Sequence, residues 1–331
     1  MKAQMIRENG GPEVLQPAEV ERPSAAPGQV LVEVAASSVN TADLMARSMG
    51  PVVNFIPTPP AVLGMDFAGT VQAVGDGVTA YKVGDEVYGC AGGVAAHPGT
   101  LSEYIAADER LIARKPESVS MTEAAALPLV AMTAFEALFD RLGLKAGQTL
   151  LIHGGAGGVG HIAIQLAVAA GARVFATDSG ATRLSAIADL GATPIDYAVT
   201  KVQDYVGLHT NGQGFDMVFD TVGGANLPNS FAAVKLNGHV ATTVSIGEVD
   251  LTMAHLQGAS LHVIYMLIPL IHDYGAKRHG QILEAVAELV DAGKVRPIVD
   301  SVFPLDNAEG AHRRLESKAA IGKVVVEVMK A

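Results

Sequence analysis

The stretch Thr149-Leu150-Leu151-Ile152-His153-Gly154-Gly155-Ala156-Gly157-Gly158-Val159-Gly160 decides the fold of this chain. The apolar run before the glycines and the apolar pattern after them, residues 161–167, predict a strand, a tight turn and a helix. Gly155, Gly157 and Gly160 have the G-x-G-x-x-G spacing, which makes the turn, lets the backbone approach a pyrophosphate and packs helix on strand. The start of the helix offers unpaired N–H groups and a positive dipole end. We therefore expect a dinucleotide site, rather than an ordinary turn, formed by Gly155, Ala156, Gly157, Gly158, Val159 and Gly160.

The sequence pattern on either side of this stretch predicts two domains. From residue 123 onward, helical segments alternate with short β-branched runs at residues 149–153, 173–177, 193–196, 215–219, 239–244 and 261–265. Such alternation is typical of a doubly wound parallel sheet, so the fold class is α/β. Before residue 123, short strands between turn signals predict a compact β-barrel-like domain. The tail does not extend the α/β pattern, so we expect domains at 1–122 with 268–331 and at 123–267.

Composition excludes several functional classes. The chain has 331 residues, a formal net charge of -11 and a pI near 5.3, which argues against nucleic-acid and anionic-membrane surfaces. Cys90 is the single cysteine, so no internal disulfide can form and a reducing compartment is expected. We see no apolar leader and no run long enough to span a bilayer. A soluble, cytoplasmic protein is the expectation.

Several blocks of sequence resemble the medium-chain dehydrogenase/reductase superfamily, and within it the zinc-independent quinone oxidoreductase (zeta-crystallin-like) branch. They include Val39-Asn40-Thr41-Ala42-Asp43, Gly64-Met65-Asp66 within residues 59–69, and the segments 83–87, 99–104, 124–128, 132–134, 215–224 and 311–325. The blocks keep the family's order along nearly the whole chain. The resemblance implies a GroES-like catalytic domain built from both chain ends, a Rossmann domain between them, and a homodimer whose sheets join through the strand at 261–265.

The resemblance also allows the zinc-ligand positions of related enzymes to be compared with this chain. Zinc-dependent alcohol dehydrogenases of this superfamily place a cysteine ligand where this chain has Asn40, and a histidine ligand where it has Met65. One cysteine cannot supply the four-cysteine structural site. We therefore expect no zinc, and the zinc-type alcohol dehydrogenase alternative is disfavoured because its ligands are missing.

Four side chains bear on the choice between NADP(H) and NAD(H). Asp178 follows the second strand, where an acid usually accepts the ribose hydroxyls of NAD and repels the 2′-phosphate of NADP. Arg183, Tyr197 and Lys318 resemble the phosphate contacts of the quinone reductase branch, although each can equally be read as an ordinary surface or strand residue. Three donors against one acid favour NADP(H), and NAD(H) stays possible.

The expected chemistry is hydride transfer from the cofactor to a small quinone or α,β-unsaturated carbonyl, with the protein supplying orientation and electrostatics. Asn40 is the candidate for orienting the substrate or nicotinamide, and Arg47 for supplying positive charge. Asp43 is expected to hold Arg47 or a backbone turn. Thr133 is placed near the nicotinamide by resemblance or bonds its own helix, and Ser245 and Gly247 follow a strand at the ligand-binding edge. A non-catalytic NADPH-binding protein is the remaining alternative.

Overall fold

The computed structural model of the chain describes residues 1–50 and 56–329, and its contacts divide the chain into two compact units. A terminal unit contains Met1–Met132, Leu267–Gly293 and Pro297–Ala331, and a central unit contains Thr133–Met266 and Lys294–Arg296. The helix α3 (Pro128–Phe135) carries the chain from the first unit into the second.

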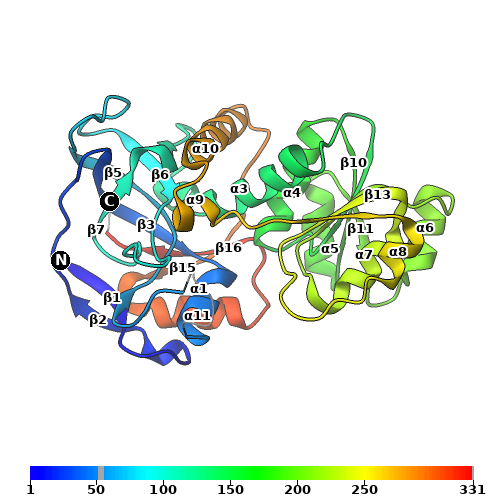
Figure 1. Cartoon of the computed structure of the whole chain (residues 1–331), viewed down its shortest axis with the longest axis horizontal. Helices are drawn as coiled ribbons and strands as arrows, with labels where there is room; N and C mark the ends of the chain where they lie inside the picture. The colour runs from blue at the N-terminus through cyan, green and yellow to red at the C-terminus, as the bar shows by residue number, and fades with distance from the viewer. Residues whose placement is uncertain (51–55, 330–331) are drawn as a thin grey trace. The chain divides into compact units, whose positions relative to one another are not determined.

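β-Structure dominates the terminal unit (Figure 1). Within residues 1–50 and 56–329 its larger sheet has seven strands in the order β15-β16-β3-β5-β6-β8, with β7 also paired to β3. These strands are β15 (Val299–Pro304), β16 (Lys323–Glu327), β3 (Gln29–Val39), β5 (Asp66–Val74), β6 (Glu86–Cys90), β8 (Ile112–Arg114) and β7 (Tyr104–Asp108). A smaller sheet contains β2 (Gln16–Glu19), β1 (Lys2–Ile6) and β4 (Ala61–Val62).

The strand β3 organises the larger sheet because three other strands pair with it. Its β-branched residues Val30, Val32 and Val34 are fully buried, as the packing of a half-buried pleated strand requires. The last strand, β16, runs antiparallel to β3 with Val324 opposite Val39. This register carries residue 323, from the end of the chain, to the position beside residue 40.

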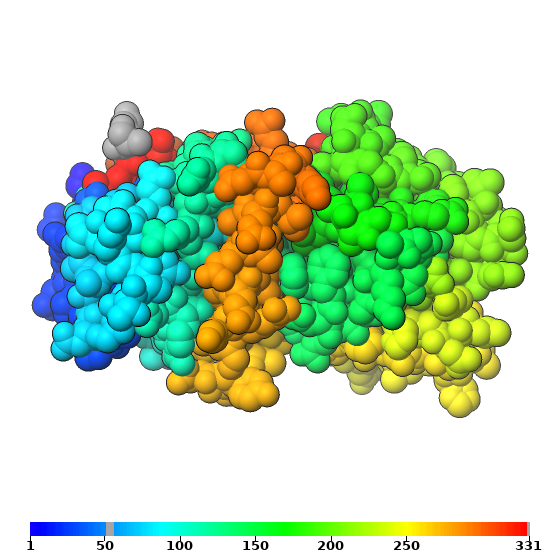
Figure 2. Space-filling view, turned by 90° about the horizontal axis from the view of Figure 1, so that it is seen from above, coloured from blue at the N-terminus to red at the C-terminus, as the bar shows by residue number. Residues whose placement is uncertain are grey.

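Helices pack against the strands of the terminal unit. They are α1 (Thr41–Ser48), α2 (Met121–Ala125), α9 (Ile268–His272), α10 (Ala276–Asp291) and α11 (Ala308–Glu316), with the short 3₁₀ turns η1 (Pro12–Val14), η2 (Glu109–Leu111) and η5 (Leu305–Asn307). Figure 2 shows α10, in orange, on the surface beside the segment that contains η2 and β8. Its buried stripe, which includes Ile282, Leu283 and Val286, faces this segment of the unit.

The central unit is built on one parallel sheet. Within the described residues it has six strands in the order β11-β10-β9-β12-β13-β14, and each pairing is parallel. The strands are β9 (Thr149–His153), β10 (Arg173–Asp178), β11 (Thr193–Asp196), β12 (Phe215–Asp220), β13 (Val234–Thr242) and β14 (Ser260–Val263). The expected doubly wound α/β fold is confirmed.

The strand order reverses direction between β9 and β12, so the helices before and after this reversal cover opposite faces of the sheet. Right-handed crossovers place α4 (Gly158–Ala169) and α5 (Ala181–Asp189) on one face, and α6 (Val202–Thr210), α7 (Leu227–Ala233) and α8 (Thr252–Gln257) on the other (Figure 1). The π-helix η3 (Glu136–Arg141) continues α3, and the turn η4 (Gly224–Asn226) precedes α7. Phe175, Phe215 and Phe231 are among the apolar side chains of the core.

Two strands differ by more than one residue from the pattern expected from the sequence. The fifth strand of the sheet spans Val234–Thr242 rather than 239–244, because the Thr242 hydroxyl bonds the backbone of Val244 and turns the chain. The sixth spans Ser260–Val263 rather than 261–265. No helix in the part of the chain that the structure describes is long and apolar enough to cross a membrane.

Candidate functional site

The glycines of the turn between β9 and α4 have different structural tasks. A Cβ on Gly155 would lie 2.7 Å from the Cβ of Ala176 in β10, so Gly155 is needed for close packing of the turn on the sheet. A Cβ on Gly160 would overlap the carbonyl oxygen of Gly154, so Gly160 lets the helix begin against the turn. A Cβ on Gly157 would meet only the Gly154 carbonyl oxygen, at 3.3 Å. Packing therefore requires glycine strictly at positions 155 and 160 and less strictly at position 157.

Gly157 caps the N-terminus of α4, and the space above it is open. The first backbone hydrogen bond of the helix runs from the His161 N–H to the Gly157 carbonyl oxygen at 3.0 Å. The N–H groups of Gly158, Val159 and Gly160 come before that bond, as the first N–H groups of any helix do. An open Cβ position beside unbonded N–H groups and a positive dipole end is a cradle that fits a phosphate.

Asp178 ends β10 and ties the neighbouring backbone together. Its Oδ2 accepts a hydrogen bond from the Ala156 N–H at 3.0 Å, which links it to the glycine-rich turn. Its Oδ1 accepts from the Ser179 N–H at 3.0 Å and from Arg183 Nε at 2.7 Å. Asp178 and Arg183, whose charges have opposite effects on the choice of cofactor, therefore form an ion pair.

The remaining cofactor candidates lie on two different units. Tyr197 is 60% exposed, and its hydroxyl accepts from Ser179 Oγ at 3.3 Å, so it joins the Asp178 group. Ser245 and Gly247 follow β13, and Gly247 has a φ of +106° with no atom near its Cβ position. Lys318 is exposed after α11, in the terminal unit. Within the central unit, the structure thus brings together the glycine turn, Asp178, Arg183 and Tyr197.

Polar residues at the ends of neighbouring strands form a buried layer that we did not predict. His153 Nδ1 shares a 2.9 Å hydrogen bond with Thr177 Oγ1, and among the described residues its Nε2 has no partner. Burial lowers the pKa of His153, and the charge of Asp220 opposes this shift. Asp220 itself accepts bonds from the backbone N–H groups of Val222 and Gly223. Consecutive strands that each end in a polar residue were the signal in the sequence.

Asn40 is the N-cap of α1 in the terminal unit, and charged groups surround its amide. Its Nδ2 donates to Asp66 Oδ2 at 2.9 Å, and its Oδ1 accepts from Lys323 Nζ. Lys323 Nζ also donates to the Val39 carbonyl oxygen at 3.1 Å and lies 3.5 Å from Asp66 Oδ2. The Ser38 hydroxyl and the Leu129 N–H donate to Asp66, each at 2.8 Å. Neither Asp66 nor Lys323 was selected as a site residue from the sequence.

Asp43 holds a backbone turn, one of the two roles expected for it. Its Oδ2 accepts from the Asn40 N–H at 2.8 Å, and its Oδ1 has no partner within residues 1–50 and 56–329. Burial raises the pKa of Asp43 to about 7, while the hydrogen bond from the Asn40 backbone lowers it and the charge of Asp66 raises it. The folded protein therefore opposes ionisation of this carboxyl.

Arg47 contacts three groups of the protein in the terminal unit. The guanidinium is buried, with Nε donating to the Gly10 carbonyl oxygen at 3.1 Å and Nη1 3.1 Å from His312 Nδ1. Its Nη2 pairs with Glu316. These groups engage all three guanidinium nitrogens, so Arg47 ties α1 to α11. The expectation that Arg47 supplies positive charge to a substrate stays a prediction.

Thr133 is 5% exposed and lies on α3, one helical turn after Leu129. The expectation that it contacts the nicotinamide stays a prediction.

The donor set near Asn40 does not resemble a zinc site. Met65 and Cys90 are fully buried, and the Asn40 oxygen is bound to Lys323. Burial also raises the pKa of the Cys90 thiol, which opposes formation of the thiolate that zinc binds. Among the residues that the structure describes, no group of three or more His, Cys, Asp or Glu side chains could hold a metal ion.

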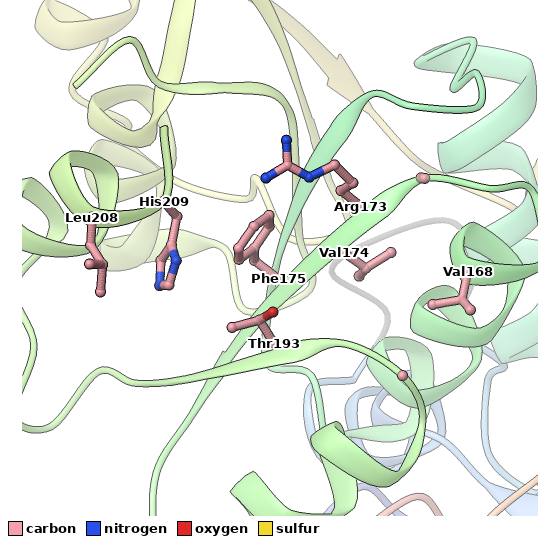
Figure 3. A pocket seen from close by; sticks show the side chains of 9 residues that line it. Val168, Arg173, Val174, Phe175, Thr193, Leu208 and His209 are labelled. Carbon is pink, nitrogen blue, oxygen red and sulfur yellow. The ribbon is translucent and has the colours of Figure 1, made fainter. Parts of the chain in front are cut away.

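Two pockets lie at the opposite edge of the central sheet from the glycine turn. One, of about 440 Å³, is lined by residues that include Arg173, Phe175 and His209, and in Figure 3 the rings of Phe175 and His209 lie next to each other, tilted by 44°. The other, of about 820 Å³, contains Thr149 and Asp216, from the beginnings of β9 and β12. Parallel sheets bind cofactors at the carboxyl ends of their strands, so neither pocket is the cofactor crevice.

Comparison with known families and curated proteins identifies relatives along nearly the whole chain. The alcohol dehydrogenase GroES-like domain matches residues 26–117, and the zinc-binding dehydrogenase family matches residues 190–326. A 2-methylene-furan-3-one reductase from Solanum lycopersicum is 34% identical, over 98% of this chain and 79% of the relative. A chloroplastic NADPH-dependent alkenal/one oxidoreductase from Arabidopsis thaliana is 32% identical, over the same shares of the two chains.

Solved structures agree with these relatives. A crystal structure of an alcohol dehydrogenase superfamily protein from Novosphingobium aromaticivorans is 40% identical, with a TM-score of 0.95 over 99% of this chain and 100% of that one. The quinone oxidoreductase from Coxiella burnetii is 31% identical, with a TM-score of 0.84 over 99% of both chains. Together with the two-unit fold and the glycine-rich turn, these similarities show that the chain belongs to the medium-chain dehydrogenase/reductase superfamily, alongside quinone and enone oxidoreductases.

Proposed function

We propose that this protein is an NAD(P)H-dependent oxidoreductase that transfers a hydride to a quinone or an α,β-unsaturated carbonyl without a metal ion. The observation that carries the proposal is the division of tasks within the glycine turn. Gly155 and Gly160 are required by packing, whereas Gly157 keeps open the space above the first N–H groups of α4. A phosphate can approach the helix N-terminus through that open space.

NADPH is the cofactor that we propose. The 2′-phosphate must lie near the end of β10, where Asp178 would repel it. The ion pair with Arg183 and the hydrogen bonds from Ala156 and Ser179 neutralise and occupy the Asp178 carboxylate, which weakens that repulsion. Tyr197 adds a hydroxyl to the same group. The name of the Arabidopsis relative, an NADPH-dependent enzyme, is consistent with this choice.

The chemistry follows from the groups that remain. When bound, the reduced nicotinamide supplies the hydride. Quinones and enones are already electrophilic and need a hydrogen-bond donor at the carbonyl oxygen, where negative charge develops. Asn40 can serve as that donor, because one of its two Nδ2 hydrogens goes to Asp66 and the other has no partner among the described residues.

A homodimer is part of the proposal. The strand β14 is an edge of the central sheet within the described residues, and its unpaired backbone groups can pair with the same strand of a second copy. Light scattering at micromolar concentration should give twice the monomer mass of 34.1 kDa. The monomer mass would contradict this part of the proposal.

The test of function is NADPH oxidation with two acceptors, 9,10-phenanthrenequinone and 1-octen-3-one, in the presence of EDTA. We expect turnover with at least one acceptor, a higher kcat/KM with NADPH than with NADH, and no stoichiometric zinc by elemental analysis. Activity lost with EDTA and restored by zinc would favour the alcohol dehydrogenase alternative. Tight NADPH binding by calorimetry without turnover would identify a non-catalytic NADPH-binding protein.

A further inference from the structure

A buried lysine and a buried aspartate hold the Asn40 amide. Burial lowers the pKa of Lys323, whereas the nearby carboxyls of Asp66 and Asp43 raise it. Lys323 is 2% exposed and Asp66 is fully buried. The two residues come from β16 and β5, on either side of β3, whose end carries Asn40. Taking an ammonium and a carboxylate out of water costs several kcal/mol each in real proteins, so a buried pair is weak evidence for stability alone. Stability alone therefore does not explain why Lys323 and Asp66 are buried together.

The charges dictate which way the Asn40 amide faces. The Lys323 ammonium, which lies 3.5 Å from Asp66, has only hydrogen-bond donors. It must therefore meet the oxygen of the Asn40 amide rather than its nitrogen. An ionised carboxylate has only acceptors, so Asp66 Oδ2 must meet the amide nitrogen, at 2.9 Å. If the amide were turned over, its nitrogen would face the Lys323 ammonium, donor against donor. Its oxygen would face the Asp66 carboxylate, acceptor against acceptor. The orientation of the Asn40 amide is therefore fixed by charge rather than by packing.

This fixed orientation leaves one group for a ligand. One Nδ2 hydrogen is donated to Asp66, and the second has no partner in the part of the chain that the structure describes. An ammonium at the amide oxygen also draws electron density from the nitrogen, and hydrogen bonds in such a chain strengthen one another at low dielectric. The contacts with Lys323 and Asp66 thus fix the direction of the second N–H and make it a stronger hydrogen-bond donor.

We propose that Lys323 and Asp66 are positioning residues that hold the Asn40 amide so that its second N–H donates to the carbonyl oxygen of the substrate. This inference rests on the proposed function for its catalytic consequence, but the orientation of the amide can be measured without turnover. The competing explanation is structural: Lys323 bonds the Val39 carbonyl oxygen and so ties β16 to β3.

The catalytic test removes both charges at once, since removing one would leave the other buried and unpaired. The variant is Lys323→Met/Asp66→Asn, measured alone and with Asn40→Ala. The matched control is Lys235→Met/Asp216→Asn, which removes an ion pair of 2.7 Å from the central unit. Thermal unfolding and the NADPH dissociation constant are measured for every variant, so that a loss of fold is recognised.

We expect the Lys323/Asp66 variant to lower kcat about tenfold or more, because a donor to developing negative charge is misplaced. Its NADPH dissociation constant should stay within about twofold of the wild type, as should both constants of the control. In the Asn40→Ala background the two substitutions should lower kcat no further. An unchanged kcat, or the same loss of kcat with and without Asn40, would overturn the inference.

A second measurement needs no activity. In protein labelled with ¹⁵N-asparagine, the side-chain signals of Asn40 are those that vanish in Asn40→Ala. Both the wild type and the variant give two signals, because rotation about the amide C–N bond is slow. We expect a wide difference in chemical shift between the two hydrogens and slow exchange with solvent in the wild type, and a smaller difference with faster exchange in the Lys323/Asp66 variant. Signals that do not change between the two would refute the positioning role. If the wild type does not oxidise NADPH but the signals do change, the proposed function fails and the positioning role stands.

Discussion

Replacing Gly157 by valine separates cofactor binding from folding more cleanly than any other change in the turn. Gly157 has φ -77° and ψ 178°, values that any residue adopts. The added Cβ meets one atom, the Gly154 carbonyl oxygen at 3.3 Å, so the turn needs to shift by only a few tenths of an ångström. We expect the free energy of unfolding to change by about 1 kcal/mol or less, since reduced freedom of the unfolded chain offsets part of that shift.

The effect on binding should be much larger. The two methyl groups of valine would stand where a phosphate reaches the N–H groups of Gly158, Val159 and Gly160. A hydrogen bond to a charged group contributes about 1.5–3 kcal/mol. If one such bond is lost, at about 2–3 kcal/mol, the NADPH dissociation constant should rise about 30- to 150-fold, because every 1.4 kcal/mol is tenfold.

Isothermal calorimetry with NADPH and thermal unfolding by circular dichroism measure the two quantities. Gly207→Val is the matched control, because Gly207 lies on α6 with no atom near its Cβ position. Gly160→Ala is the opposite case: its Cβ overlaps the Gly154 carbonyl oxygen, so we expect it to lower the melting temperature. NADPH binding by Gly157→Val as tight as that of the wild type and the control would refute the site assignment.

Three further predictions follow from the ionisable groups. Arg183→Ala should raise the KM for NADPH far more than the KM for NADH, because it removes the charge that neutralises Asp178; equal effects in steady-state kinetics would make Asp178 the ribose acceptor of an NADH enzyme. Burial raises the pKa of Asp43 from 3.8 to about 7, so the folded state holds this proton more tightly than the unfolded state does. The free energy of unfolding should therefore fall, by up to about 4 kcal/mol, as the pH rises from about 4 to about 7. Urea unfolding at about pH 5 and about pH 8 should show this fall in the wild type and a smaller fall in Asp43→Asn. An equal change of the unfolding free energy with pH in the two proteins would contradict the prediction. Arg47→Met should lower the melting temperature, since the contacts to Gly10, His312 and Glu316 are lost; an unchanged kcat of the folded enzyme would contradict a role of Arg47 at the substrate site.

Local patterns were predictable from the sequence because local geometry determines them. The glycine spacing, the apolar strand before it and the helix after it lie within one short segment, so backbone conformation and packing at that segment suffice. The alternation of strands and helices likewise predicted a parallel sheet. Strand ends were less predictable: β13 ends at Thr242 because of a hydroxyl–backbone bond that hydrophobic periodicity cannot reveal.

Contacts between distant residues were not predictable. Lys323 and Asn40 are 283 positions apart, and only the register of β16 on β3 brings them together. Charges that seemed to compete in the sequence, Asp178 and Arg183, are partners in the structure, because one helical turn of α5 places the guanidinium on the carboxylate. The contacts of Arg47 were not predictable for the same reason: its partners His312 and Glu316 lie on the helix α11, far along the sequence.

The return of β16 to β3 also sets an order of assembly during synthesis. The central unit is nearly continuous in sequence, so its sheet can form once residue 266 has left the ribosome. The larger sheet of the terminal unit waits for residues 323–327, the last strand to be made. Until then Asp66 and the Asn40 amide face no ammonium. A chain that stops before residue 323 would therefore leave the larger sheet of the terminal unit unfinished, and quality-control proteases can degrade such a species.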